Sequence, residues 1–296
     1  MRSSFYTGPI QMQLQLLLIL KSPHLVRIIW ECSQQDTAER PLALLASAVR
    51  SGQFSGERQV RLISLGLGKS DFQLLDFQCL LESLTGLKEL DLNRTNFNRS
   101  SWNAMRERGP QLRRMLTVLN LGDCSQMDGA LVHEILCEMP SLEIFKADHV
   151  MEDNLIQDPR PWACEELREL SVALVDDRRR VGVENEEQRW PQSRLVRQLS
   201  ALHQLQVLDF QMGNNRLLRD EEILPIKLTL GNGGCLDQLR SLRWMRCFWA
   251  PGYSQQINWG EAEVQWVMKH WIRLQKWANV FEDYDEDPLT MAYLNE

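Results

Sequence analysis

The stretch LTVLNLGDC, residues 116–124, spaces its leucines by three and then by two positions and ends in a cysteine. This spacing fits neither the period of about 3.6 residues of an α-helix nor the two-residue period of a β-strand. It fits a short strand in which Leu119 and Leu121 point to one face, while Leu116 enters the same core just before the strand begins. Cys124 then occupies the position at which the chain turns away from the strand.

The same pattern occurs several more times, which predicts an architecture of stacked repeats. Successive copies start between 25 and 38 residues apart, so the longer ones contain insertions. The copies are LVRIIWEC (25–32), VRLISLGL (60–67), LKELDLNRT (87–95), LTVLNLGDC (116–124), LEIFKADHV (142–150), LRELSVALV (167–175), LQVLDFQMG (205–213), LRSLRWMRC (239–247) and LQKWANV (274–280). In this frame Cys247 closes a turn as Cys124 does, and Asn279 in an apolar slot marks a terminal unit.

Helical patterns lie between the predicted strands. Residues 71–86, 128–140, 193–204 and 260–274 each place apolar side chains at helical spacing, with Asp71 as a predicted N-cap. The side chains expected to face the core from three of these helices are Phe72, Leu75, Cys79, Leu80, Leu84, Leu131, Ile135, Leu136, Met139, Val264, Val267, Met268, Trp271 and Ile272.

The alternation predicts one α/β solenoid of eight or nine units. We expect a horseshoe with a parallel β-sheet on its concave face and helices on its convex face. Residues 1–24 are expected to form an N-terminal capping helix, and residues 25–281 the repeat domain. Insertions rich in charge or glycine are expected near 176–192 and 213–234, and residues 282–296 are expected to form a disordered acidic tail.

Tryptophan is concentrated at the end of the chain, where six of the ten fall after residue 243. Two interpretations are open: an aromatic binding platform, or a cap that closes the end of the core. The cap is favoured because Trp244, Trp271 and Trp277 occupy predicted core slots. Trp266 lies off the helical stripe and is expected to be exposed.

These repeats resemble the helix-bearing leucine-rich repeats of ribonuclease-inhibitor-like proteins over roughly residues 11–281. The segment DPRPWACEELREL (158–170) resembles a P-W-x-C-x-x-L-x-x-L junction of fungal F-box/leucine-rich-repeat-like proteins, and its matching residues are Trp162, Cys164, Leu167 and Leu170. This resemblance implies substrate recognition in a ubiquitin-ligase context. An F-box needs roughly 40–50 residues ahead of the repeats. Only 24 residues precede Leu25, so we expect no adaptor-docking segment in this sequence.

Composition narrows the classes of function. The balance of 33 basic and 40 acidic residues gives a net charge of −7, which argues against a nucleic-acid partner. Seven cysteines without a C-x-x-C pair predict reduced thiols in an intracellular protein. The apolar run 14–20 is too short to span a bilayer, and no membrane partner is expected.

Two short motifs suggest chemistry. GLGKS (66–70) resembles part of a phosphate-binding loop, but Ile63 stands where that loop needs a glycine, so we interpret it as a strand-to-helix turn. A nucleotide-dependent switch or an enzyme is kept as the alternative function. His133 and Cys137 share a helical face, but a structural zinc site needs four ligands, and a satisfied histidine beside a packed thiol is favoured. No metal, cofactor or catalytic residue is predicted.

The residues expected to bind a partner lie on the concave face. Side chains at positions 3, 5 and 7 of each unit point away from the core, because successive residues of a strand face opposite sides. Carboxylates outnumber Lys146 in the central units, so the expected partner is a protein with a basic patch; the alternative is that these are only solvated strand residues. The predicted binding residues are Glu89, Asp91, Asn93, Val118, Asn120, Ile144, Lys146, Asp148, Glu169, Ser171, Val207, Asp209, Gln211 and Arg243.

Overall fold

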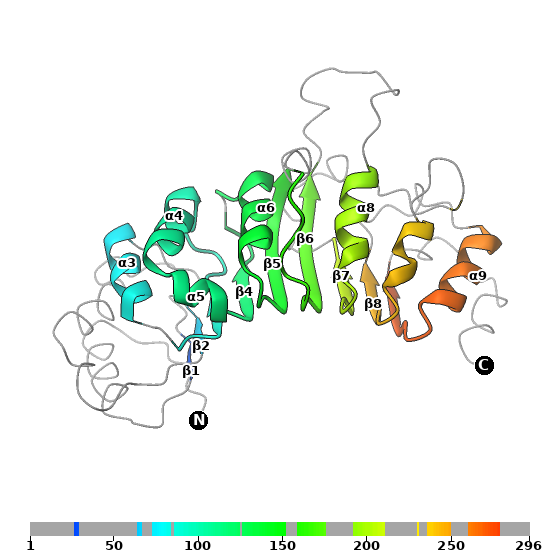
Figure 1. Cartoon of the computed structure of the whole chain (residues 1–296), viewed down its shortest axis with the longest axis horizontal. Coiled ribbons are helices and arrows are strands. Elements are labelled where there is room, and N and C mark those ends of the chain that lie inside the picture. Colours follow the sequence, from blue (N-terminus) through cyan, green and yellow to red (C-terminus); the bar gives the residue numbers. More distant parts are fainter. Residues whose placement is uncertain are drawn as a thin grey trace, which may run out of the picture.

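A single parallel sheet organises the chain (Figure 1). The computed structural model describes residues 27–29, 64–66, 73–83, 86–124, 126–151, 159–175, 192–210, 230, 236–249 and 260–278. Within them nine strands pair in parallel in the order of the sequence. They are β1 Arg27–Ile29, β2 Ser64–Gly66, β3 Glu89–Asp91, β4 Val118–Leu121, β5 Ile144–Met151, β6 Glu169–Val175, β7 Val207–Asp209, β8 Cys247–Trp249 and β9 Lys276–Ala278.

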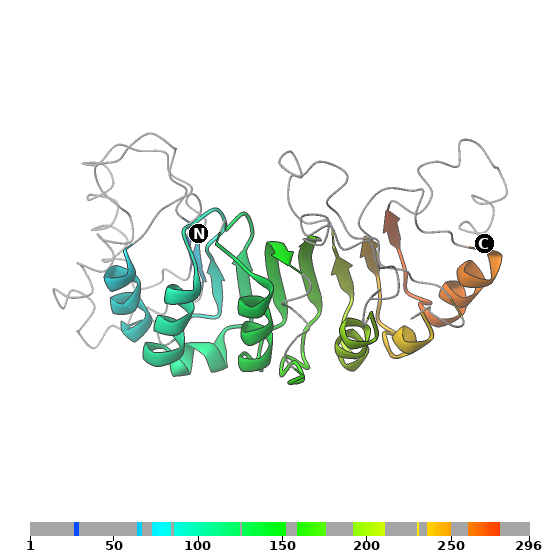
Figure 2. The same cartoon turned by 90° about the horizontal axis from the view of Figure 1, so that it is seen from above.

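The described helices lie on one side of this sheet. Figure 2 shows the strands on the inner side of a curved array and the helices along its outer side. The helical elements are α3 Leu74–Ser83, α4 Arg99–Arg108, α5 Pro110–Met115, α6 Gly129–Glu138, α8 Gln192–Ala201, the 3-10 helix η4 Leu236–Ser241 and α9 Glu261–His270. The predicted parallel sheet with helices packed against one side is confirmed for these residues.

Local sequence signals set the helix boundaries. The side chain of Asp128 accepts a hydrogen bond of 2.6 Å from the backbone N–H of Leu131 and so caps α6. The side chain of Asn98 accepts from the backbone N–H groups of Ser100 and Ser101 and caps α4. The predicted helix at 128–140 is therefore confirmed, and Pro140 follows its end.

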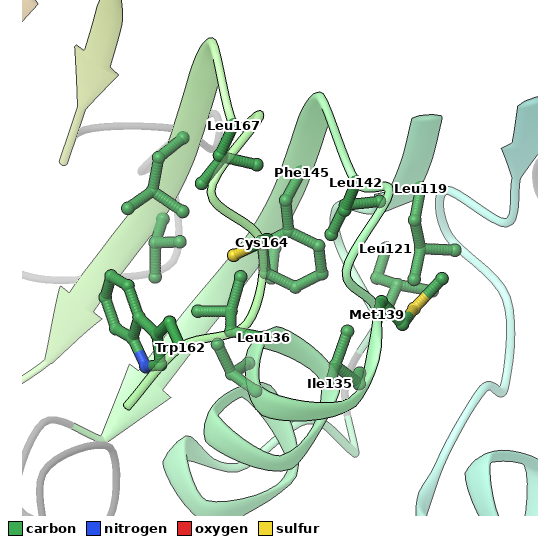
Figure 3. Close-up of a cluster of buried hydrophobic side chains, with 14 of the residues drawn as sticks. Leu119, Leu121, Ile135, Leu136, Met139, Leu142, Phe145, Trp162, Cys164 and Leu167 are labelled. Carbon is green, nitrogen blue, oxygen red and sulfur yellow. The ribbon is translucent and has the colours of Figure 1, made fainter. Parts of the chain in front are cut away.

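The core lies between the sheet and the helices. In the opening stretch Leu116, Leu119, Leu121 and Cys124 have no exposed surface, as their spacing predicts. Figure 3 shows Ile135 and Leu136 of α6, and Met139 directly after it, packed towards this side of the sheet. Burial of each such side chain stabilises the fold by about 1.5–3 kcal/mol, so a long series of inward positions supplies most of the stability.

The turn after the strand is built in the same way in two neighbouring units. The thiol of Cys124 donates to the carbonyl oxygen of Leu92 at 3.2 Å, and the Thr95 hydroxyl donates to the same oxygen at 2.7 Å. One residue earlier, Arg94 and Asp123 adopt left-handed backbone conformations with φ of 58° and 54°. Their side chains form an ion pair at 2.8 Å. Cys124 is therefore a structural residue of the turn.

Two copies of the repeat have a different register from the one predicted. Ser64 pairs with Glu89, which shifts the second copy by two residues. Cys247 pairs with Val207, which shifts the eighth copy by six residues. The segment around the eighth strand contains two consecutive apolar frames, one at 239–244 and one at 245–250. The first frame enters η4 and the turn after it, so the second becomes the strand and Cys247 does not close a turn.

The prediction of core or exposed position is wrong for two tryptophans. Trp244 lies in the turn before β8 and is 40% exposed, although a core position was predicted. Trp266 is buried, although exposure was predicted. Its indole N–H donates to Asp237 at 3.0 Å, and its ring packs edge-on against Trp271 at 5.9 Å between centroids. A tryptophan can be buried away from the apolar stripe because one polar partner satisfies its N–H.

Two helices also bury a different set of side chains from the one predicted. Leu75 of α3 is 68% exposed, because Phe77, Leu80 and Leu81 form the buried face of that helix. Near the chain end, the predicted buried face of α9 and the residues after it is confirmed only in part. Val267 and Trp271 are buried, whereas Met268 and Ile272 are exposed and Val264 is half-buried.

Several predicted segments lie outside the described residues. These are the capping helix at 1–24, the acidic tail at 282–296, Asp71 and almost all of both insertions. Gly66 is buried within β2 and does not lie in a turn, while the rest of GLGKS lies outside the described residues.

Candidate functional site

The strand register aligns two rows of side chains on the inner face of the sheet. The first row joins Glu89, Val118 and Ile144 on neighbouring strands and continues through Glu169 and Val207. The second row, two residues further along each strand, consists of Asp91, Asn120, Lys146, Ser171 and Asp209. The predicted alternation is thus present on five strands, and the residues between the two rows are buried.

An apolar pair lies at the centre of the first row. Val118 and Ile144 are register partners on β4 and β5, and both are half-buried. Glu89 and Glu169 flank them on β3 and β6. A small apolar spot between carboxylates resembles the centre of a protein interface, in which apolar contact gives affinity and the charges at the rim give specificity.

The charge balance of this face is acidic. Lys146 forms an ion pair with Glu169 on the neighbouring strand, so the one cation of the central rows is neutralised. Glu89, Asp91 and Asp209 add negative charge to either side of that pair. The described part of this face therefore carries a net negative charge.

Two polar side chains of the second row also shape the turns after their strands. Asp91 accepts a hydrogen bond of 3.0 Å from the backbone N–H of Asn93. Asn120 occupies the same repeat position and accepts one of 3.1 Å from the backbone N–H of Gly122. These side chains hold the strand ends in addition to facing the concave side, a structural role that the repeat pattern alone did not predict.

Four of the predicted binding residues are placed differently or are not described. Arg243 is not on a strand: it lies in the turn between η4 and β8, because the eighth copy has the shifted register. Ser171 faces the inner side but is only 3% exposed, so its hydroxyl is not presented on the surface. The side chain of Asp148 is not described, and Gln211 lies outside the described residues.

The corrected register adds residues that the sequence reading missed. Cys247 and Trp249 of β8 extend the two rows beyond Val207 and Asp209. Lys276 of β9 extends the first row once more. The frame Met245–Phe248–Ala250 has the same spacing as Leu205–Leu208–Phe210 and could have identified them. The inner face thus changes from acidic in the middle to aromatic and basic at its carboxyl-terminal end.

The histidine and cysteine singled out in the sequence belong to a network on the outer side. The indole N–H of Trp162 donates to Nδ1 of His133 at 3.3 Å. Nδ1 therefore carries no proton, so Nε2 holds it and donates to the sulfur of Cys137 at 3.2 Å. His133 is buried, and its two ring nitrogens are both satisfied. The interpretation of a satisfied histidine beside a thiol is confirmed.

The same network fastens the segment 159–164 between two helices. The side-chain amide of Gln198 on α8 donates to the carbonyl oxygen of Arg160 at 2.8 Å and accepts from the N–H of Trp162 at 3.1 Å. The N–H of Ala163 donates to the carbonyl oxygen of Leu136 on α6 at 2.9 Å. Residues 159–164, which contain Trp162 and Cys164 of the P-W-x-C junction, are thus held against both α6 and α8.

Cys164 is chemically inert in this setting. Burial raises the pKa of its thiol to about 12, and Cys137 adds to the effect, while a backbone hydrogen bond opposes it. Among the described residues no group of three or more His, Cys, Asp and Glu side chains is arranged to hold a metal ion. Cys137, Cys164 and His133 therefore contribute packing and hydrogen bonds to the outer side of the fold.

The chain has the fold of a leucine-rich-repeat solenoid. Among solved structures it is similar to a leucine-rich-repeat protein of Leptospira interrogans, with 14% identity and a TM-score of 0.46 over 94% of this chain and 58% of that one. It is also similar to an internalin from Listeria monocytogenes, with 14% identity and a TM-score of 0.42 over 87% of this chain and 62% of that one. Because both TM-scores are below 0.5, the assignment of the fold rests on the repeat and the strand register and not on these two similarities.

The chain spans less than two thirds of the length of either of these proteins. No protein-family model matches the sequence, and no curated protein matches it. In the described part of the chain, every helix is too short or too polar to cross a bilayer.

Proposed function

We propose that this chain is a non-catalytic, intracellular protein-recognition module that binds its partner through the inner face of the sheet. The observation that carries the proposal is the row Glu89–Val118–Ile144–Glu169, in which a half-buried apolar pair lies between carboxylates on four adjacent strands. Rigid strands hold these side chains at fixed spacing, so little conformational entropy is lost when a partner docks.

The partner is a protein that presents an apolar side chain beside lysine or arginine. The apolar residue would contact Val118 and Ile144, and its basic neighbours would face Glu89 and Asp91. The resemblance of residues 158–170 to F-box/leucine-rich-repeat-like proteins supports a finer version of this proposal, in which the partner is a substrate of a ubiquitin ligase. A nucleotide-dependent switch is less favoured, because Gly66 of the GLGKS stretch is buried within β2.

The test is affinity capture with quantitative mass spectrometry from a cell extract. Wild type is compared with Val118→Lys/Ile144→Lys, which replaces the apolar pair by charges that repel a basic partner. The matched control is Leu74→Lys/Leu75→Lys, which adds the same charge at two exposed apolar side chains of α3. We expect the inner-face variant to lose specific proteins that the control retains. Equal recovery from all three proteins would show that the inner face is not the binding surface.

A further inference from the structure

A cluster of positive charge lies at the last two repeat units. Residues 236–249 and 260–278 contain six basic and three acidic residues, a balance of +3 in a chain whose net charge is −7. Four of these cations, together with one tryptophan, form what we call the basic edge. Its members are Arg240, Arg243, Trp244, Lys269 and Arg273.

The members of the basic edge lie close together. η4 and α9 both lead into turns, and these turns are neighbours because β8 and β9 pair in register. The guanidinium carbon of Arg273 lies 3.9 Å from the ring centroid of Trp244 in the preceding unit. The pKa of His270 is lowered. The largest cause is partial removal of its ring from water, and the positive charges of Arg240, Lys269 and Arg243 lower the pKa further. The carboxylate of Asp237 partly offsets this lowering.

Among the described residues, no carboxylate forms an ion pair with a member of the basic edge. Asp237 accepts from the indole of Trp266, and Glu261 accepts from the side chain of Gln265. Glu263 accepts a hydrogen bond from the backbone N–H of Gly260 at the start of α9. The ion pairs of the described residues join cations and acids from Glu82 to Glu169 and include no member of the basic edge.

The geometry suits carboxylates in particular. A guanidinium stacked on an aromatic ring keeps its N–H donors in the plane of the group, where they can bind a carboxylate in a two-pronged manner. Arg273 is held in this way by Trp244, and Arg243 adjoins that ring in the sequence. All four cations are exposed, so an incoming acidic chain reaches them directly.

We propose that the basic edge is a second docking surface, which binds an acidic peptide segment of a partner protein. It differs from the inner face in position, because it lies on the turns at the amino-terminal ends of β8 and β9, and in charge, because it is cationic. A peptide is favoured over nucleic acid because Arg273 covers one face of Trp244, which leaves that face unavailable for stacking on a base. Binding of the chain's own acidic stretch 282–287 is an alternative that the test below distinguishes.

The test is the binding of a fluorescein-labelled hexaglutamate peptide, measured by fluorescence anisotropy at low salt. We expect Arg240→Glu/Arg243→Glu/Lys269→Glu to weaken binding at least roughly tenfold, since each exposed ion pair contributes modestly and three are reversed. The matched control is Lys88→Glu/Arg114→Glu/Arg197→Glu, which makes the same change of charge at exposed residues elsewhere. We expect it to change the affinity by less than about threefold. Trp244→Ala, which changes no charge, is expected to weaken binding severalfold because Arg273 loses its support.

Three outcomes would overturn the proposal. The first is equal weakening by the control variant, which would indicate general attraction to positive charge. The second is tighter binding of labelled oligodeoxythymidylate than of hexaglutamate, with loss of that binding in the charge-reversed variant, which would assign the surface to nucleic acid. The third is much tighter hexaglutamate binding by Asp283→Asn/Asp285→Asn/Asp287→Asn, which would show that the chain's own tail occupies the surface.

Discussion

Replacing Phe248 or Trp244 by alanine distinguishes two registers of the eighth repeat. The frame 239–247 predicts that Trp244 fills the core, whereas the structure places Phe248 there with no exposed surface and leaves Trp244 40% exposed. Phe248 also packs against Trp271 at 5.6 Å between ring centroids. Truncation of a fully buried phenylalanine to alanine costs about 3–5 kcal/mol of the free energy of unfolding.

The corresponding cost for Trp244→Ala is smaller. An exposed cation–π contact contributes about 0.5–1 kcal/mol. Adding the part of the ring that is covered, we expect a total below about 2 kcal/mol. Urea denaturation followed by circular dichroism measures both variants, and it avoids a fluorescence signal that the loss of a tryptophan would change. A larger loss of stability for Trp244→Ala than for Phe248→Ala would refute the register described above.

Further predictions concern α3, the outer network and Cys164. Leu75→Lys should change the free energy of unfolding by less than about 0.5 kcal/mol, whereas Leu80→Ala should cost about 2–5 kcal/mol; similar urea midpoints would contradict the assigned buried face. Trp162→Phe should lower the free energy of unfolding by about 1–3 kcal/mol, because Nδ1 of His133 loses its hydrogen-bond donor. A double-mutant cycle with His133→Leu should show that the two substitutions are coupled. Additive effects would exclude the hydrogen bond between Trp162 and His133. Cys164 should resist iodoacetamide in the native protein near neutral pH. Because the pKa of Cys164 is raised in the folded state, its thiol contributes stability that is lost as pH rises from 9.0 towards about 12. Cys164→Val should therefore reduce the fall of the melting temperature with pH over this range. A fall equal to that of the wild type would contradict this.

The repeat could be predicted because its residues obey one rule of spacing. Leu116, Leu119 and Leu121 fill the same three slots as their counterparts in neighbouring units, and each slot is set by the alternation of a short strand. Helix α6 was predictable for a similar reason, since Asp128 and Pro140 mark its ends. The inner-face rows follow from the same register wherever the frame was read correctly.

The remaining features depend on contacts between units. The segment before β8 has two apolar frames, and only the packing of η4 selects the second one. Trp266 is buried because Asp237, on another unit, accepts its N–H. The sequence alone does not show these contacts, so Arg243 was wrongly assigned to the inner face. In the structure it lies with the other residues of the basic edge. The ion pair between Lys146 and Glu169 likewise joins different strands, so a count of charges along the sequence overstated the free charge of the inner face.

Site-specific photocrosslinking tests the central proposal most directly. The photoreactive residue p-benzoylphenylalanine is placed at Val118 in one protein and at the exposed Leu75 of α3 in another, and both are irradiated in the same cell extract. We predict a covalent adduct with a discrete partner protein from position 118 and none of that partner from position 75. An adduct with the same partner from position 75 alone would contradict recognition through the inner face.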